Sequence, residues 1–104
     1  MKQQICILGS TGSIGTQALD VISQHPDLYE AYALTANRRW KELAAQARRF
    51  HPAAVVIADE TFYEPLVKEL ADMPDVKVYC GSKALEEIVE SPSIDMVLTA
   101  MVGY

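Results

Sequence analysis

Residues 9–15 combine three glycines with three hydroxyl side chains, a mixture that can bind a phosphate group. The segment reads GSTGSIG, with glycines at the spacing G-x-x-G-x-x-G: Gly9, Gly12 and Gly15, with Ser10, Thr11 and Ser13 between them. Where such a segment leaves a strand and enters a helix, unpaired N–H groups, the helix dipole and the hydroxyls all face one anion. The spacing predicts a diphosphate cradle, and the lack of a following Gly-Lys-Ser/Thr argues against a nucleoside-triphosphate loop.

The flanking residues supply the strand and the helix that this cradle needs. The uncharged run Ile5–Leu8 is typical of a parallel strand that is buried on both faces. After the glycines a helical apolar face begins, and the helix ends before His25-Pro26. The residues expected on that inward face are Ile14, Ala18, Val21 and Ile22.

Each glycine has a predicted task in this arrangement. We expect Gly9 to turn the chain sharply off the strand and Gly12 to leave room for a phosphate. Gly15 would let the helix pack close to the strand. The competing interpretation is that the three glycines only make a tight connection between strand and helix.

A second group of residues indicates which dinucleotide is bound. In NAD-binding folds an Asp or Glu about twenty residues beyond the glycines accepts hydrogen bonds from the adenosine ribose. Here the count leads to Thr35, followed by Ala36, Asn37, Arg38 and Arg39, with no carboxylate. Guanidinium groups bind phosphate well and are unfavourable at a helix N-terminus, so the two arginines predict a 2′-phosphate site and hence NADP. Alternatively both arginines are simply solvated, and Asn37 can cap the next helix, contact the cofactor or do both.

A third cofactor contact is expected near the end of the chain. Residues 99–103 read TAMVG and end a strand that we place beside the first one. In this fold that end faces the nicotinamide half of the cofactor, so Ala100 and Met101 are candidate contacts. The alternative is that they are ordinary strand residues.

The remaining chain alternates predicted strands and helices. Strands are expected at 5–8, 29–36, 54–58, 76–80 and 96–101, and helices at 14–24, 40–50, from Asp59 or Thr61 to Asp72, and after a Ser82 cap. This alternation predicts an α/β fold, a Rossmann-like doubly wound parallel sheet in a three-layer α/β/α arrangement. Residues 1–104 would form one domain, with the strands in the order fourth, third, second, first, fifth.

Composition narrows the function classes. A net charge of −5 argues against a nucleic-acid surface, and no apolar run reaches transmembrane length. The first strand begins too early to leave room for a signal peptide, so we expect no membrane association and a cytoplasmic location. Cys6 and Cys80 are expected to be free thiols. The sequence predicts neither a catalytic site nor a metal site. Glu86, Glu87 and Glu90 are expected on the solvent-exposed face of a helix.

Taken together, these segments resemble the 1-deoxy-D-xylulose 5-phosphate reductoisomerase family from its amino terminus. The resemblance covers the whole chain. Its residues are GSTGSIG with the following ALDVI and His-Pro, the pattern LxxQxxxFxPxxVxxxD from Leu43 to Asp59, and IDMVLTAMVG. On this resemblance Thr11, Gly12, Ser13 and Ile14 match the diphosphate-binding residues, and Asn37, Arg38 and Arg39 match the 2′-phosphate loop. That loop usually reads Gly, a basic residue, then Asn. Here Asn37 stands in place of the glycine and Arg39 in place of the asparagine; the change at position 39 adds a positive charge, so the NADPH preference is expected to remain.

The resemblance implies an enzyme that rearranges 1-deoxy-D-xylulose 5-phosphate and reduces the product with NADPH to 2-C-methyl-D-erythritol 4-phosphate, in isoprenoid-precursor synthesis. It also implies a Mg²⁺ or Mn²⁺ ion on the phosphosugar substrate, and a homodimer at full length. The metal ligands and the catalytic and C-terminal domains would lie beyond Tyr104. We therefore expect these 104 residues alone to bind NADPH weakly and to catalyse nothing.

Two other functions fit the same residues. One is an NADP-dependent reductase or epimerase, which would need a downstream Tyr-x-x-x-Lys pair in the short-chain type or a cysteine nucleophile in the semialdehyde type. The other is a non-catalytic NADP-sensing module, which would bind the dinucleotide but lack an acidic cluster after Gly103.

Overall fold

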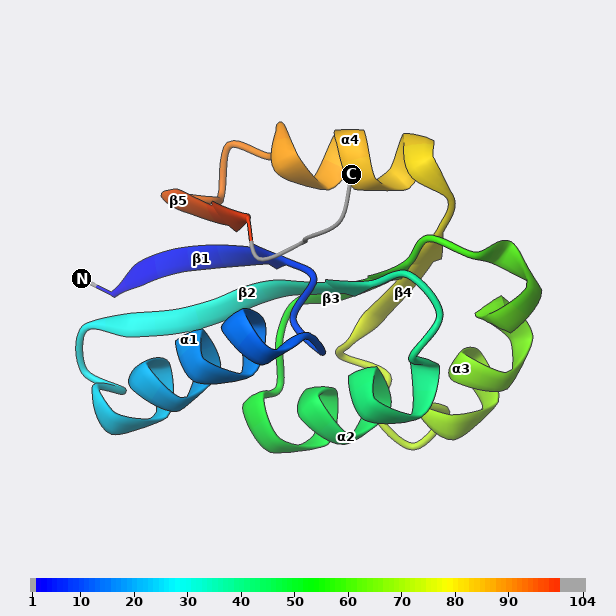
Figure 1. Ribbon diagram of the computed structural model, residues 1–104, viewed down its shortest axis with the longest axis horizontal. Helices are drawn as coiled ribbons and strands as arrows, with labels where there is room; N and C mark the ends of the chain where they lie inside the picture. Colours follow the sequence, from blue (N-terminus) through cyan, green and yellow to red (C-terminus); the bar gives the residue numbers. More distant parts are fainter. Residues whose placement is uncertain (1, 100–104) are drawn as a thin grey trace.

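A five-stranded parallel sheet runs through the molecule, with helices on both of its faces (Figure 1). The computed structural model describes residues 2–99. The strands are β1 (Gln3–Leu8), β2 (Tyr29–Ala36), β3 (Ala54–Ile57), β4 (Lys77–Cys80) and β5 (Met96–Thr99). The helices are α1 (Ser13–Gln24), α2 (Trp40–Phe50), the 3-10 turn η1 (Glu60–Phe62), α3 (Tyr63–Glu69) and α4 (Ser82–Val89).

The strand order is β4-β3-β2-β1-β5, which confirms the predicted fold and the predicted order. The chain moves outward from β1 through β2 and β3 to β4, then returns across the sheet so that β5 pairs with the free side of β1. This reversal places a topological switch point at the carboxyl end of β1, where ligands collect in open α/β sheets.

The two faces of the sheet are covered unequally. Helices α1, α2 and α3 lie on one face, and α4 lies alone on the other (Figure 1). The main core lies between the three helices and the sheet. Its fully buried side chains include Ile7, Leu34, Leu43, Val55 and Ile57. None of the α4 residues is fully buried, although Ala84, Leu85, Ile88 and Val89 form the expected half-buried stripe.

The inward face of α1 differs from the predicted one. Ile22 is buried and Ala18 packs against the core, as predicted, but Ile14 and Val21 are 52% and 50% exposed, and Gly15 and Leu19 are buried. The backbone of α1 packs against the glycine turn at Gly15, so the buried face of the helix begins at a residue with no side chain. A pattern of apolar side chains alone does not count a glycine as an inward position, and this is why the prediction was wrong at Ile14 and Val21.

Two helix boundaries also correct the predictions. The Asp59 side chain accepts a hydrogen bond from the Thr61 N–H at 3.0 Å and caps η1, which confirms Asp59 as the predicted cap. The helical segment ends earlier than predicted, because α3 stops at Glu69 rather than at Asp72. Ser82 is the first residue of α4 rather than its cap. The N-cap position is occupied by Gly81, which has φ 91° and no side chain that could cap the helix.

Within residues 2–99 we find no helix that combines the length and the apolar character needed to cross a bilayer.

Candidate cofactor-binding site

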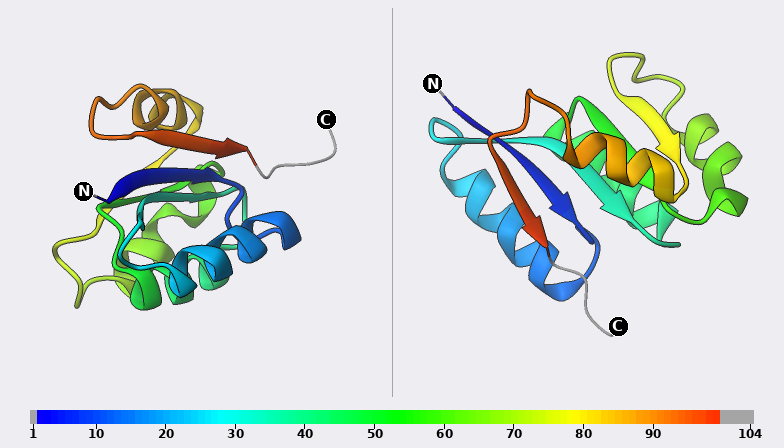
Figure 2. Two further views of the ribbon diagram at one scale, coloured as in Figure 1. Left: turned by 90° about the vertical axis from the view of Figure 1, so that its left-hand side faces the viewer. Right: turned by 90° about the horizontal axis from the view of Figure 1, so that it is seen from above.

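The predicted cofactor residues come together where parallel strands end. All five strands point the same way, so the loops that follow β1, β2 and β3 leave the sheet at one edge (Figure 2). The loop after β1 carries the glycines, and the loop after β2 carries Asn37, Arg38 and Arg39. Hydrogen bonds between β2 and the glycine turn hold these two loops side by side.

The glycine turn packs directly under the first turn of α1. Gly9 has a φ of 86°, in the region that favours glycine, and its carbonyl oxygen accepts a hydrogen bond from the Gly12 N–H at 3.2 Å. A Cβ atom on Gly15 would overlap the Gly9 carbonyl oxygen and lie 2.6 Å from the Ser10 Cα. Gly15 is therefore required by the close approach of helix and turn, and Gly9 by the turn itself.

The amino end of α1 lacks a side-chain cap. Gly12 is the N-cap residue, with an extended backbone at φ −77° and ψ 171°, and no side chain accepts a hydrogen bond from the first turn. The first N–H groups of a helix have no acceptors inside it, so those of Ser13 and Ile14 are available to a ligand. Thr11 is half-buried and Ser13 is exposed. This arrangement suits an anion at the positive end of the helix dipole.

Ser10 does not fit the expectation that all three hydroxyls face one anion. Its side chain is completely buried, and its hydroxyl lies 2.7 Å from Gln46 Oε1 and 3.2 Å from the Thr35 carbonyl oxygen. Gln46 Nε2 in turn donates to the Ser10 carbonyl oxygen at 2.8 Å. The Ser10 side chain therefore faces the protein interior, and any contact of Ser10 with a cofactor would come from its backbone.

Thr35 completes this polar cluster from the end of β2. Its hydroxyl oxygen accepts a hydrogen bond from the Gly9 N–H at 3.0 Å, and its carbonyl oxygen accepts one from the Ser10 N–H at 2.8 Å. From the sequence, Thr35 marked only the position about twenty residues beyond the glycines, and Gln46 was not predicted to be part of the site. The available signal was a polar residue inside an apolar pattern: Thr35 ends the run YEAYALTA, and Gln46 lies between Leu43 and Phe50 on the inner side of α2.

The loop after β2 presents its two guanidinium groups at the surface. The side chains of Arg38 and Arg39 are 75% and 68% exposed. Arg38 Nε lies 3.4 Å from Asp59 Oδ2, and Arg39 Nε lies 3.9 Å from Glu42 Oε2. Each arginine therefore keeps its terminal nitrogens available for a phosphate, while a neighbouring carboxylate limits the conformations of the side chain.

Asn37 does not cap α2. The N-cap residue is Arg39, and no side chain caps this helix, so the capping role considered for Asn37 is wrong. Asn37 is exposed, and its carbonyl oxygen accepts a hydrogen bond from the Asp59 N–H at 3.0 Å. Hydrogen bonding to Thr61, aided by the positive charge of Arg38, lowers the pKa of Asp59 below its usual value. Asp59 therefore stays ionised at neutral pH beside Asn37, Arg38 and Arg39, which together form the arginine loop.

Other predicted residues are placed as follows. Trp40 is half-buried and packs against the core, with Lys41 Nζ 5.7 Å from its ring centre. Cys6 is buried and Cys80 half-buried, and both are free thiols. Ala100 and Met101 lie outside the described residues. In residues 2–99 no three side chains of His, Cys, Asp or Glu are grouped so that they could hold a metal ion.

The family model, the similar sequences and the similar structures all point to one enzyme family. The family model described as 1-deoxy-D-xylulose 5-phosphate reductoisomerase matches residues 5–104. The 1-deoxy-D-xylulose 5-phosphate reductoisomerase of Bacteroides thetaiotaomicron is 65% identical over 103 residues, which cover 99% of this chain and 26% of that protein. The chain thus spans about a quarter of the length of such relatives.

The solved structures that are similar to this chain belong to the same family. The reductoisomerase from Zymomonas mobilis in complex with NADPH superposes with a TM-score of 0.92 at 38% identity, over 99% of this chain and 27% of that one. A reductoisomerase in complex with NADPH, fosmidomycin and magnesium gives a TM-score of 0.90 at 37% identity, over 97% of this chain and 25% of that one.

Proposed function

The chain belongs to the 1-deoxy-D-xylulose 5-phosphate reductoisomerase family, and on this basis we propose that it forms the NADPH-binding part of such an enzyme. Membership of this family argues against the alternative that the chain is a short-chain or semialdehyde-type reductase. The proposal assigns the cofactor site to this chain and the rearrangement of substrate to the complete protein.

One observation carries the proposal for this chain's own residues. An uncapped helix N-terminus lies over a glycine turn, and two exposed guanidinium groups project from the loop after the adjacent strand. The first feature suits a diphosphate, because backbone N–H groups and the helix dipole both favour an anion. The second suits an additional phosphate, because arginine binds phosphate with several nitrogens at once. NADPH carries both groups, whereas NADH carries only the diphosphate.

The residues then divide into three sets. The backbone from Gly9 to Ile14 would hold the diphosphate, with hydroxyl contacts from Thr11 and Ser13. Asn37, Arg38 and Arg39 would hold the ribose 2′-phosphate. Ala100 and Met101 remain the proposed contacts of the nicotinamide half.

In the whole enzyme, bound NADPH would supply the hydride that reduces the rearranged substrate. This chain's residues would bind the two phosphate regions and so fix where the nicotinamide end lies, and they would contribute no proton transfer. A Mg²⁺ or Mn²⁺ ion would be held by residues outside this chain. We further propose that the complete protein acts on a phosphosugar, forms a homodimer and is located in the cytoplasm. Nucleic acids and membranes are not expected among its partners.

Dissociation constants for NADPH and NADH, measured on the 104-residue chain and its Arg38→Ala variant, test the cofactor assignment. We expect the parent to prefer NADPH and the variant to lose about tenfold in NADPH affinity, because it loses one charged contact to phosphate. NADH binding should not change. Equal affinities of the parent for NADPH and NADH would refute the assignment of a 2′-phosphate site.

A further inference from the structure

The Gln46 side chain reaches from the middle of α2 to the glycine turn and makes two hydrogen bonds to one residue there. Nε2 donates to the Ser10 carbonyl oxygen at 2.8 Å, and Oε1 accepts from the Ser10 hydroxyl at 2.7 Å. We propose that Gln46 is a positioning residue that, through Ser10, fixes the direction in which the turn presents its backbone N–H groups to the diphosphate of the cofactor. This inference rests on the proposed function.

The planarity of the peptide group makes this contact directional. In a trans peptide the C=O and the following N–H point in opposite directions. Gln46 holds the Ser10 carbonyl toward α2, so the N–H of the same peptide group, which belongs to Thr11, points away from α2. The structure shows no acceptor for that N–H among residues 2–99. It is therefore directed toward the proposed ligand side of the turn.

The contacts of Ser10 with β2 leave this peptide group for Gln46 to orient. The Ser10 N–H donates to the Thr35 carbonyl oxygen at 2.8 Å, and the Gly9 N–H donates to the Thr35 hydroxyl at 3.0 Å. These bonds fix the two preceding peptide groups of the turn. The next peptide group, which joins Ser10 to Thr11, is held by the Gln46 amide.

The role assigned to Gln46 concerns only one half of the cofactor. The arginine loop lies before the first residue of α2, and Arg38 and Arg39 pair with Asp59 and Glu42 rather than with the Ser10 cluster. Loss of the Gln46 amide should therefore weaken ligands that carry a diphosphate and leave ligands that carry only a 2′-phosphate unaffected. A general loosening of the fold would weaken both classes.

Two small ligands separate these outcomes. ADP-ribose has the diphosphate without a 2′-phosphate, and adenosine 2′-phosphate has the reverse. Gln46→Met removes both polar atoms at nearly constant volume, and Gln24→Met makes the same change at an exposed position at the far end of α1. Dissociation constants for both ligands would be measured by ligand-detected NMR on the 104-residue chain and both variants.

We expect Gln46→Met to weaken ADP-ribose binding about tenfold, the effect of one to two net hydrogen bonds. Binding of adenosine 2′-phosphate should stay unchanged, and Gln24→Met should alter neither ligand. If Gln46→Met weakens both ligands equally, or neither, the positioning role is wrong.

A second variant keeps the test decisive if Gln46→Met does not fold by circular dichroism. Gln46→Ala also removes the Nε2 donor to the Ser10 carbonyl oxygen and places a strong helix former in α2, so the same selectivity is expected with a loss of about tenfold. An equal effect on both ligands, or no effect, would overturn the role. If the parent chain binds no ADP-ribose, the proposed function fails as well. If the parent binds it and the variants bind it equally well, only the inference about Gln46 fails.

Discussion

The Gly15 Cα faces the Gly9 carbonyl oxygen so closely that a Cβ at position 15 would overlap it. The opposing atoms belong to the backbone of the turn, so they cannot move aside as a flexible side chain would. Gly15→Ala must push α1 away from the sheet, and we expect it to lower the free energy of unfolding by about 3 kcal/mol, at the upper end for overpacking. Urea denaturation would measure this, with Gln17→Ala on the exposed side of α1 as the control. Equal midpoints for the two variants would contradict the packing.

Gly12 offers the opposite combination of effects. Its backbone at φ −77° and ψ 171° is open to any residue, so Gly12→Ala introduces no backbone strain. Because alanine is a poorer N-cap residue than glycine, the variant should lower the free energy of unfolding by no more than about 1 kcal/mol. If a phosphate lies against the N-terminus of α1, however, the new methyl group should weaken NADPH binding by about tenfold or more, because N–H contacts to a charged group are lost. Denaturation and a cofactor titration on the same sample would separate the two effects. Unchanged NADPH affinity would argue against a phosphate at this position.

The contrast between Gly12 and Gly15 shows which features of the fold could be predicted from the sequence. The spacing of glycines after an apolar run was enough to predict a strand, a turn and a helix, and the alternation of segments was enough for the strand order. The exposure of Ile14 was not predictable, since it depends on how closely α1 packs against the glycine turn at Gly15.

The polar cluster was hidden for a related reason. Ser10 reads as one more hydroxyl in a phosphate loop, and only the packing of α2 against the turn shows that it faces inward. Thr35 and Gln46 interrupt apolar patterns, which marks them as unusual, but their common partner is 25 to 36 residues away in the chain. Local patterns contain no information about a contact over that separation.

The two cysteines should react at very different rates. Burial raises the pKa of the Cys6 thiol to about 11, so almost no thiolate is present at pH 8, and the side chain is inaccessible. Cys80 is only half-buried near the edge of the sheet. We expect a chromogenic disulfide reagent to modify one thiol in the native chain and two in urea, and Cys80→Ser to remove the fast reaction. Rapid modification of two thiols in the native state would show that β1 is not buried as described.

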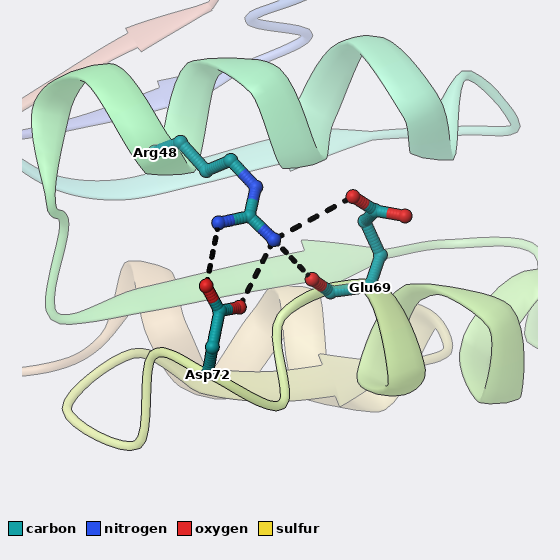
Figure 3. Close-up of polar contacts among 3 residues, drawn as sticks. All are labelled: Arg48, Glu69 and Asp72. Carbon is teal, nitrogen blue, oxygen red and sulfur yellow. Dashed lines mark hydrogen bonds and ion pairs between the residues drawn. The ribbon is translucent and has the colours of Figure 1, made fainter.

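The last prediction concerns the contact between α2 and the loop after α3. Arg48 donates to both carboxylate oxygens of Asp72 at 2.9 Å and to the Glu69 carbonyl oxygen at 2.6 Å (Figure 3). Hydrogen bonding to Arg48 lowers the pKa of Asp72 below its ordinary value of 3.8. A carboxyl group whose pKa is lower in the folded state stabilises the fold above the unfolded pKa, and this contribution disappears as the pH falls through the folded pKa.

The difference in melting temperature between the parent and Asp72→Asn should therefore be constant from pH 7 to about pH 5 and should vanish below the folded pKa of Asp72. Because the pair is exposed, the difference should be small and should shrink further in 1 M salt. Asp75→Asn is the matched control, since Asp75 makes no ion pair within residues 2–99 and lies three residues further along the same loop. A difference between parent and Asp72→Asn that persisted at pH 2 would mean that Asp72 acts through packing rather than through its charge.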